Sequence, residues 1–119
     1  MKVREIRDLL EARVLCGEDQ LENDLQGVFA SDFMSDILAF TDSQQILVTG
    51  MINPQVVRTA EMVDMKCIIF VRGKMPTEEI ISLAEESGMI VLASRFLMYS
   101  ACGILYSREE DPQDRKSVV

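Results

Sequence analysis

Three nearly continuous apolar segments constrain the fold of this chain most strongly. They lie at residues 45–49 (QILVT), 67–71 (CIIFV) and 89–93 (MIVLA). A short segment that is apolar on both faces is typical of a parallel strand covered by helices on both sides of its sheet. Amphipathic stretches of roughly ten residues separate the segments, as crossover helices would. The pattern predicts an α/β fold, a single small layer sandwich with a mostly parallel sheet flanked by helices.

Helix signals lie between and after these segments. Asn53 followed by Pro54 indicates a helix start, with Asn53 as the N-cap and proline at the first helical position. A second helix opens at residues 76–79 (PTEE) and ends at Gly88, which is placed as a C-terminal cap. A last helix is expected over residues 96–106. The second half of the chain therefore reads as alternating strands and helices.

The first half is less regular. Residues 3–12 have the spacing of an amphipathic helix, residues 14–17 and 25–30 are expected to form strands, and residues 31–40 form a further helix. The apolar stripe of the helix expected over residues 31–40 consists of Phe33, Ile37 and Phe40. Its start is left open, because three residues are suited to cap it: Ser31, Asp32 and Ser35. The expected organisation is one domain over residues 1–107 and a polar, disordered tail over 108–119.

Composition and charge exclude several function classes. The chain has no histidine, so sites that need imidazole are excluded, and 20 acidic against 12 basic residues give a net charge of −8. No Lys or Arg occurs between Arg13 and Arg58. Nucleic acids and anionic membranes are therefore not expected partners. The start of the chain does not resemble a signal peptide, and three cysteines in apolar runs indicate buried, reduced thiols and a cytoplasmic location.

No strong catalytic motif is present. The sequence has no Walker A loop, no GxGxxG and no nucleophile elbow. Adjacent acids such as Glu78 and Glu79 are typical of solvated helix faces, and no base is placed to activate a thiol. We therefore expect no enzymatic activity, no cofactor and no metal site.

The carboxyl ends of the expected strands are the candidate ligand site. Ligands of open parallel sheets bind at this edge, where helix N-termini supply amide donors for anions. Cations, glycines and hydroxyls converge there in an otherwise acidic domain. The alternative is that the basic residues are loop residues paired with nearby acids. The candidate ligand-binding residues are Thr49, Gly50, Asn53, Arg72, Gly73, Lys74, Ser94 and Arg95.

The expected last helix has no charged residue over positions 96–106. A helix that is apolar all round is covered on more than one side, and in a domain this small a subunit interface could supply the second cover. The alternative is burial between the sheet and the first helix. An apolar pair in the loop after Gly50 is either a second contact surface or local packing. The candidate interface residues of a homodimer are Met51, Ile52, Phe96, Leu97, Tyr99 and Ile104.

The order of these pieces resembles the DRTGG domain family. The resemblance rests on residues 14–17 (VLCG), 27–32 (GVFASD), 46–50 (ILVTG) and 89–94 (MIVLAS), and also on the helix start at 55–60 and on Arg72-Gly73. It covers residues 1–107. The chain departs from the family at the Asp-Arg-Thr-Gly-Gly signature, because residues 51–55 read MINPQ. A ligand role tied to that signature is therefore not implied here.

The resemblance implies a non-catalytic regulatory module. Such domains accompany CBS pairs in some pyrophosphatases and precede phosphotransacetylase catalytic domains. They are similar in fold to the N-terminal domain of the serine kinase of the sugar-transport phosphocarrier protein, whose activity belongs to a separate P-loop domain. In multidomain relatives they help to form a homodimer interface, and free-standing copies occur beside iron hydrogenase genes. We expect a regulatory or assembly module that homodimerises and binds a small anion at the strand ends. The alternative is a nucleotide or phosphometabolite sensor acting on a partner enzyme, such as a hydrogenase-associated complex.

Overall fold

A five-stranded sheet forms the centre of the molecule. The computed structural model describes residues 1–108, and its strands are β1 (Arg13–Cys16), β2 (Val28–Ala30), β3 (Ile46–Thr49), β4 (Cys67–Phe70) and β5 (Ile90–Ala93). Their order in the sheet is β1-β5-β4-β3-β2. β2, β3, β4 and β5 are mutually parallel, whereas β1 pairs antiparallel with β5. The predicted α/β fold with a mostly parallel sheet is confirmed.

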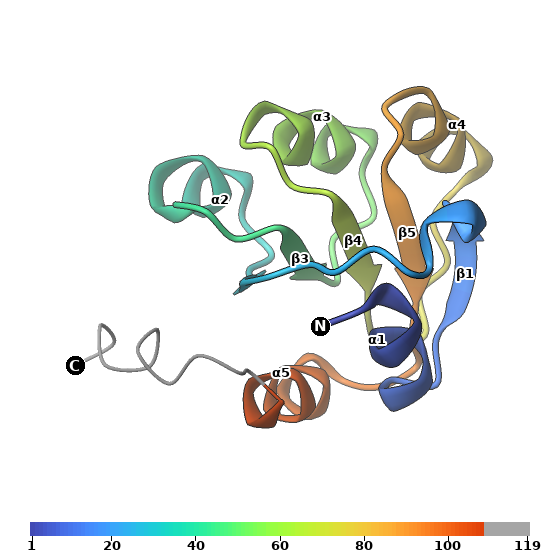
Figure 1. The fold of residues 1–119 in the computed structure, drawn as a ribbon. Coiled ribbons are helices and arrows are strands. Elements are labelled where there is room, and N and C mark those ends of the chain that lie inside the picture. The colour runs from blue at the N-terminus through green and yellow to red at the C-terminus, as the bar shows by residue number, and fades with distance from the viewer. Residues whose placement is uncertain (109–119) are drawn as a thin grey trace.

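Helices cover both faces of this sheet (Figure 1). They are α1 (Val3–Leu9), α2 (Met34–Phe40), α3 (Pro54–Met62), α4 (Glu78–Glu86) and α5 (Met98–Ser107), and a short 3-10 helix, Glu18–Gln20, follows β1. In Figure 1, α2, α3 and α4 lie on one face and α1 and α5 on the other. The architecture is therefore a three-layer sandwich.

The strand residues alternate between two apolar cores. In β3, Ile46 and Val48 belong to the core shared with α1 and α5, whereas Leu47 belongs to the core shared with α2, α3 and α4. All four residues of β3, β4 and β5 are buried. Burial on both faces explains why these strands appear in the sequence as continuous apolar runs.

The helix boundaries in the second half of the chain follow their caps. The Asn53 side chain accepts a hydrogen bond from the Gln55 amide at 2.8 Å, as expected for the N-cap of α3. Thr77 caps α4 by accepting from the Ile80 amide at 3.3 Å. Gly88, with φ of 69°, takes the left-handed conformation that follows many helix C-termini.

The prediction for α2 is corrected in two respects. The helix begins at Met34, and Phe33 occupies the N-cap position without a side-chain cap, so none of the three expected cap residues acts as one. Of the expected apolar stripe only Ile37 is buried, whereas Phe33 and Phe40 are exposed. The reason is that α2 lies over the edge of the sheet beside β2, where no further helix or strand of residues 1–108 extends over its outer side (Figure 1).

None of the helices in residues 1–108 has the length and apolar character needed to cross a bilayer. The predicted polar tail at 108–119 lies outside the described residues except for Arg108, which directly follows α5.

Candidate functional site at the carboxyl edge of the sheet

Chain segments from all five strands meet at one edge of the sheet. The carboxyl ends of β2, β3, β4 and β5 lie there because these strands are parallel. The antiparallel pairing of β1 with β5 places the start of β1 at the same edge, with Arg13 opposite Ala93. The edge therefore combines side chains from both ends of the chain.

One part of this edge is a cluster around the Asp32 carboxylate. Its Oδ1 accepts hydrogen bonds from the Gly50 amide at 2.8 Å and from the Thr49 hydroxyl at 3.2 Å. Its Oδ2 lies 3.7 Å from Nη2 of Arg72, which also donates to the Gly50 carbonyl at 3.2 Å. The donors expected to bind an external anion thus already bind an internal one. Binding of an external anion here would have to displace Asp32.

The loop after β4 is held in an unusual conformation. Arg72 has φ of 68°, in the left-handed region, which costs a residue with a Cβ roughly 1–2 kcal/mol. Its amide donates to the Phe96 carbonyl at 2.7 Å, and the Gly73 amide donates to the Ser94 carbonyl at 3.1 Å. These bonds fix the loop after β4 against the loop after β5.

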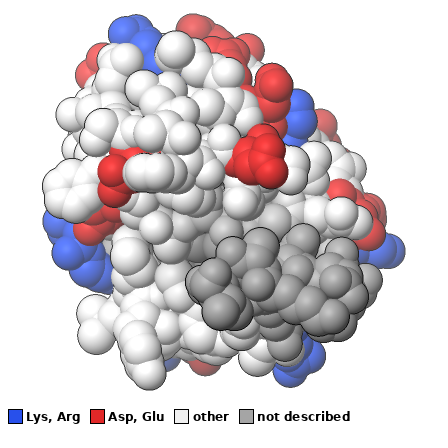
Figure 2. Space-filling model, turned by 90° about the vertical axis from the view of Figure 1, so that its left-hand side faces the viewer, with Lys and Arg blue, Asp and Glu red and all other residues white. Residues whose placement is uncertain are grey.

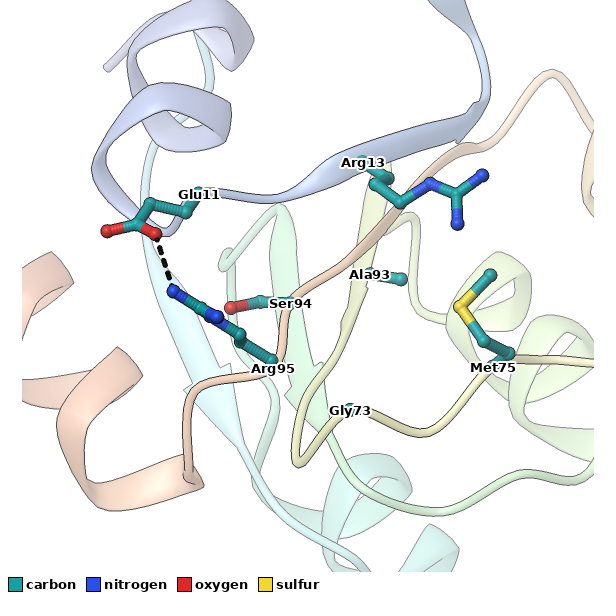
Figure 3. A pocket seen from close by; sticks show the side chains of 7 residues that line it. All are labelled: Glu11, Arg13, Gly73, Met75, Ala93, Ser94 and Arg95. Atoms are coloured by element: carbon teal, nitrogen blue, oxygen red, sulfur yellow. Dashed lines mark hydrogen bonds and ion pairs between the residues drawn. The ribbon is translucent and has the colours of Figure 1, made fainter.

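A shallow pocket of about 200 Å³ lies at the same edge of the sheet (Figure 3). It opens between the start of β1, the end of β5 and the loop after β4. Its lining consists of Glu11, Arg13, Gly73, Met75, Ala93, Ser94 and Arg95. In Figure 3 the Arg13 side chain extends toward Met75, while Arg95 points toward Glu11.

The pocket has an excess of positive charge. Arg95 Nη2 lies 3.1 Å from the Glu11 carboxylate, so this pair is neutral. Arg13 has no ion-pair partner among residues 1–108 and contributes the excess charge. Glu11 also has a left-handed backbone, with φ of 50°, so two of the strained residues of the chain, Glu11 and Arg72, belong to this edge. Strain of this kind tends to gather at functional sites.

Comparison with known proteins identifies the family. The model of the DRTGG domain matches residues 5–106, nearly the whole described chain. The chain belongs to the DRTGG domain family. A search of curated proteins gave no match for this DRTGG domain.

A solved structure supports the fold of this DRTGG domain. It contains the CBS and DRTGG domains of the regulatory region of the Clostridium perfringens pyrophosphatase, complexed with its activator, diadenosine tetraphosphate. The match has a TM-score of 0.73 at 18% identity and covers 87% of this chain and 45% of that chain. The DRTGG domain described here thus spans under half of its structural relative, and the likeness concerns the fold.

The predicted ligand residues separate into groups in this DRTGG domain. Thr49, Gly50 and Arg72 belong to the Asp32 cluster, and Asn53 caps α3. Lys74 is exposed in the loop after β4. The remaining three line the pocket: Gly73, Ser94 and Arg95.

Ser94 lines the pocket, but its hydroxyl is already bonded. The side chain is buried; it donates to the Leu10 carbonyl at 2.8 Å and accepts from the Phe96 amide at 3.2 Å. Ser94 therefore joins the end of α1 to the loop before α5. Its role in the described contacts is structural, and Arg95 is the predicted ligand residue whose charge lines the pocket.

The predicted interface residues are also divided. Leu97 and Tyr99 are exposed at the start of α5. The others are half-buried and pack against one or the other apolar core: Met51, Ile52, Phe96 and Ile104. For the Met51-Ile52 pair, local packing is the alternative that these contacts favour.

Sequence reasoning missed five residues of the site: Asp32 in the cluster, and Glu11, Arg13, Met75 and Ala93 in the pocket. Asp32 follows the end of β2 by two residues, so the sequence could have placed its carboxylate at the carboxyl edge of the sheet. An aspartate just before a helix is also a common N-cap, and this competing role hid the first one. Arg13 reaches the edge only because β1 is antiparallel, and nothing local to Arg13 indicates that orientation.

The three cysteines are separate from one another and lie outside the pocket and the Asp32 cluster. Cys16 and Cys67 are buried and Cys102 is half-buried, and none is in a disulfide. Burial raises the pKa of Cys67 to about 12, which opposes thiolate chemistry. Within residues 1–108, no group of three or more Cys, Asp or Glu side chains could hold a metal ion.

Proposed function

We propose that this domain is a non-catalytic regulatory module that binds a small phosphate-bearing anion in the pocket between Arg13 and Arg95. The observation that carries the proposal is the Arg13 guanidinium beside an open pocket, without an ion-pair partner in residues 1–108, in a chain whose net charge is −8. Guanidinium groups bind phosphate oxygens through paired, charge-assisted hydrogen bonds. Arg95 can exchange its exposed Glu11 partner for the ligand at little cost, because exposed ion pairs contribute little to stability.

The structural relative supports the choice of ligand class. Its regulatory region is complexed with diadenosine tetraphosphate, an activator that carries several phosphates. A pocket of about 200 Å³ would enclose a phosphate group and part of an attached sugar or base, leaving the remainder outside. Nucleotides and sugar phosphates are therefore the ligands to test first.

A melting screen tests this proposal. Phosphate, ATP, diadenosine tetraphosphate and sugar phosphates are added to the full chain at low salt. A ligand at a hundredfold excess over its dissociation constant stabilises the native state by about 2.7 kcal/mol. Arg13→Gln and Arg95→Gln should remove the shift. The matched control is Arg58→Gln, an exposed arginine on α3, which should retain it.

Two results would overturn the ligand proposal. One is the absence of a shift with every compound. The other is a shift that survives in the Arg13→Gln and Arg95→Gln variants. A shift lost instead in Arg72→Gln would move the ligand to the Asp32 cluster.

We further propose that the module homodimerises through the start of α5. Leu97 and Tyr99 are 63% and 91% exposed, and no charged residue lies within Met98–Ser107. Two copies can bring such faces together without opposing like charges. Light scattering at micromolar concentration should report a dimer, and Tyr99→Lys should yield a monomer. Met62→Lys, at an exposed position on α3, is the control that should stay dimeric, and a monomeric parent protein would reject the proposal.

A further inference from the structure

The outer side of α2 exposes large apolar side chains. Phe33 and Phe40, at the two ends of this helix, are 66% and 68% exposed, although they share an apolar stripe with the fully buried Ile37. The pattern of α2 is that of a helix with a covered face, but residues 1–108 cover it only at its middle, at Ile37. Large apolar residues exposed together in this way are typical of interaction sites.

Acidic residues accompany these aromatic side chains. Asp36 lies three residues after Phe33 and four before Phe40, so all three lie on the same side of the helix. Asp42 follows the end of α2 and is exposed. Neither Asp36 nor Asp42 has an ion-pair partner in the described part of the chain. We refer to Phe33, Asp36, Phe40 and Asp42 as the α2 face.

No basic side chain lies near in sequence to neutralise this face. The chain has no Lys or Arg from residue 14 to residue 57. Figure 2 shows the side of the molecule on which α2 lies in Figure 1: uncharged atoms cover most of it, acidic atoms interrupt them, and basic atoms lie toward the outline. The α2 face therefore combines apolar surface with uncompensated negative charge.

We propose that the α2 face binds a segment of another protein that presents large apolar side chains flanked by Lys or Arg. The apolar side chains of that segment would cover Phe33 and Phe40, and its cations would pair with Asp36 and Asp42. Charge complementarity excludes the other occupants. A second copy of this chain would set Asp36 and Asp42 against an equally acidic face, and nucleic acids and anionic lipids would be repelled.

A peptide-display selection on the immobilised full chain tests the proposal. The probe is a phage library of random 16-residue peptides, selected at low salt. The enriched peptides should carry at least two large apolar residues and a net positive charge. Failure to enrich peptides above blank beads, or enrichment of neutral or acidic sequences, would overturn the proposal.

Titration of the most enriched peptide, labelled with fluorescein, then locates the site. Replacing both aromatic residues, Phe33→Ser with Phe40→Ser, should weaken binding by about a hundredfold, because each is a large apolar contact. Asp36→Asn should weaken it by about three- to fivefold and reduce its dependence on salt. The matched control is Met62→Ser, which removes an exposed large apolar side chain from α3 and should bind as the parent does.

Two further outcomes would reject the α2 face as this binding site. Unchanged affinity in the double variant, with an unchanged melting temperature, would place the peptide elsewhere. Conversion of a dimeric parent into a monomer by Phe33→Ser with Phe40→Ser would show that a second copy occupies the face instead.

Discussion

The guanidinium group of Arg72 lies directly over the α-carbon of Gly50. A β-carbon added to Gly50 would lie only 2.6 Å from Cζ of Arg72, so no other residue type leaves this arrangement in place. The same guanidinium donates to the Gly50 carbonyl and faces the Asp32 carboxylate. Gly50, which the sequence places among the candidate ligand residues, is thus in direct contact with a side chain of the loop after β4.

The first prediction concerns this contact. Gly50→Ala should displace the Arg72 side chain and destabilise the protein by about 1 kcal/mol, since exposed charged pairs and single hydrogen bonds contribute on that scale. Arg72→Ala should cost a similar amount. The double variant should cost little more than either single one, because both remove the same interaction. Urea unfolding of the four proteins measures the coupling, and additive losses would contradict the contact.

The second prediction concerns Ser94. Ser94→Ala leaves the Leu10 carbonyl and the Phe96 amide without their shared partner in a buried place, and unsatisfied groups of this kind cost about 1–3 kcal/mol. The control is Ser82→Ala on the exposed side of α4, which should change the free energy of unfolding by less than about 0.5 kcal/mol. Equal effects of the two substitutions in urea unfolding would show that the Ser94 bonds are unimportant.

The third prediction concerns thiol labelling. Cys67 has 0% exposure and a pKa of about 12, so in the native state it should be the last cysteine to react with N-ethylmaleimide. Cys16 is also protected, because its Sγ donates to the Met89 carbonyl at 3.0 Å and burial raises its pKa. Half-buried Cys102 should react first. Mass spectrometry of tryptic peptides gives the order, and early labelling of Cys67 would mean that β4 is not covered.

The fourth prediction concerns pH and Glu22. A hydrogen bond from Arg4 Nε, at 2.6 Å, lowers the pKa of the Glu22 carboxyl in the folded state, and the charges of Arg4 and Lys2 add to this. Because the pKa of Glu22 is lower in the folded than in the unfolded protein, the charged carboxylate stabilises the fold at a pH above its unfolded pKa of about 4.3. This stabilisation is lost as the pH falls through the folded pKa. The parent should therefore be more stable than Glu22→Gln at pH 7, with the difference vanishing at low pH. A difference that does not change with pH would contradict the Arg4 contact.

The parallel strands could be predicted because the same apolar residues favour an extended strand and fill the two cores on either side of the sheet. A strand buried on both faces needs apolar side chains at every position, which Ile68, Ile69 and Phe70 supply. The start of α3 was equally predictable, because the Asn53 side chain accepts a hydrogen bond from an amide of the helix that it caps. The direction of β1 depends instead on pairing between segments that are far apart in the sequence. The segment containing Val14 and Leu15 suits either strand direction, and only its neighbour β5 makes it antiparallel.

The candidate site was predictable to the same extent. Strand ends of a parallel sheet must meet, so Gly50, Arg72 and Arg95 were expected at one edge. From the sequence Asp32 is one of three candidate helix caps, because a carboxylate accepts hydrogen bonds from any nearby amide. The sequence alone does not rank the amides of the following helix against the Gly50 amide. Phe33 and Phe40 show the converse limit: their spacing predicts burial, but only the completed fold shows that nothing in residues 1–108 covers them.

The position of β1 at the margin of the sheet has a consequence for synthesis of the chain. Within residues 1–108 its one neighbour in the sheet is β5, which is made after the other four strands. At roughly 5–20 residues per second, several seconds pass between the release of Arg13 and that of Ala93 from the ribosome. During that interval Val14, Leu15 and Cys16 have no strand beside them, and the Arg13 side of the pocket does not yet exist. The first strand of the domain therefore stays unpaired until β5 has been made, and Arg13 and Arg95 come together at one edge of the sheet only once that strand has formed.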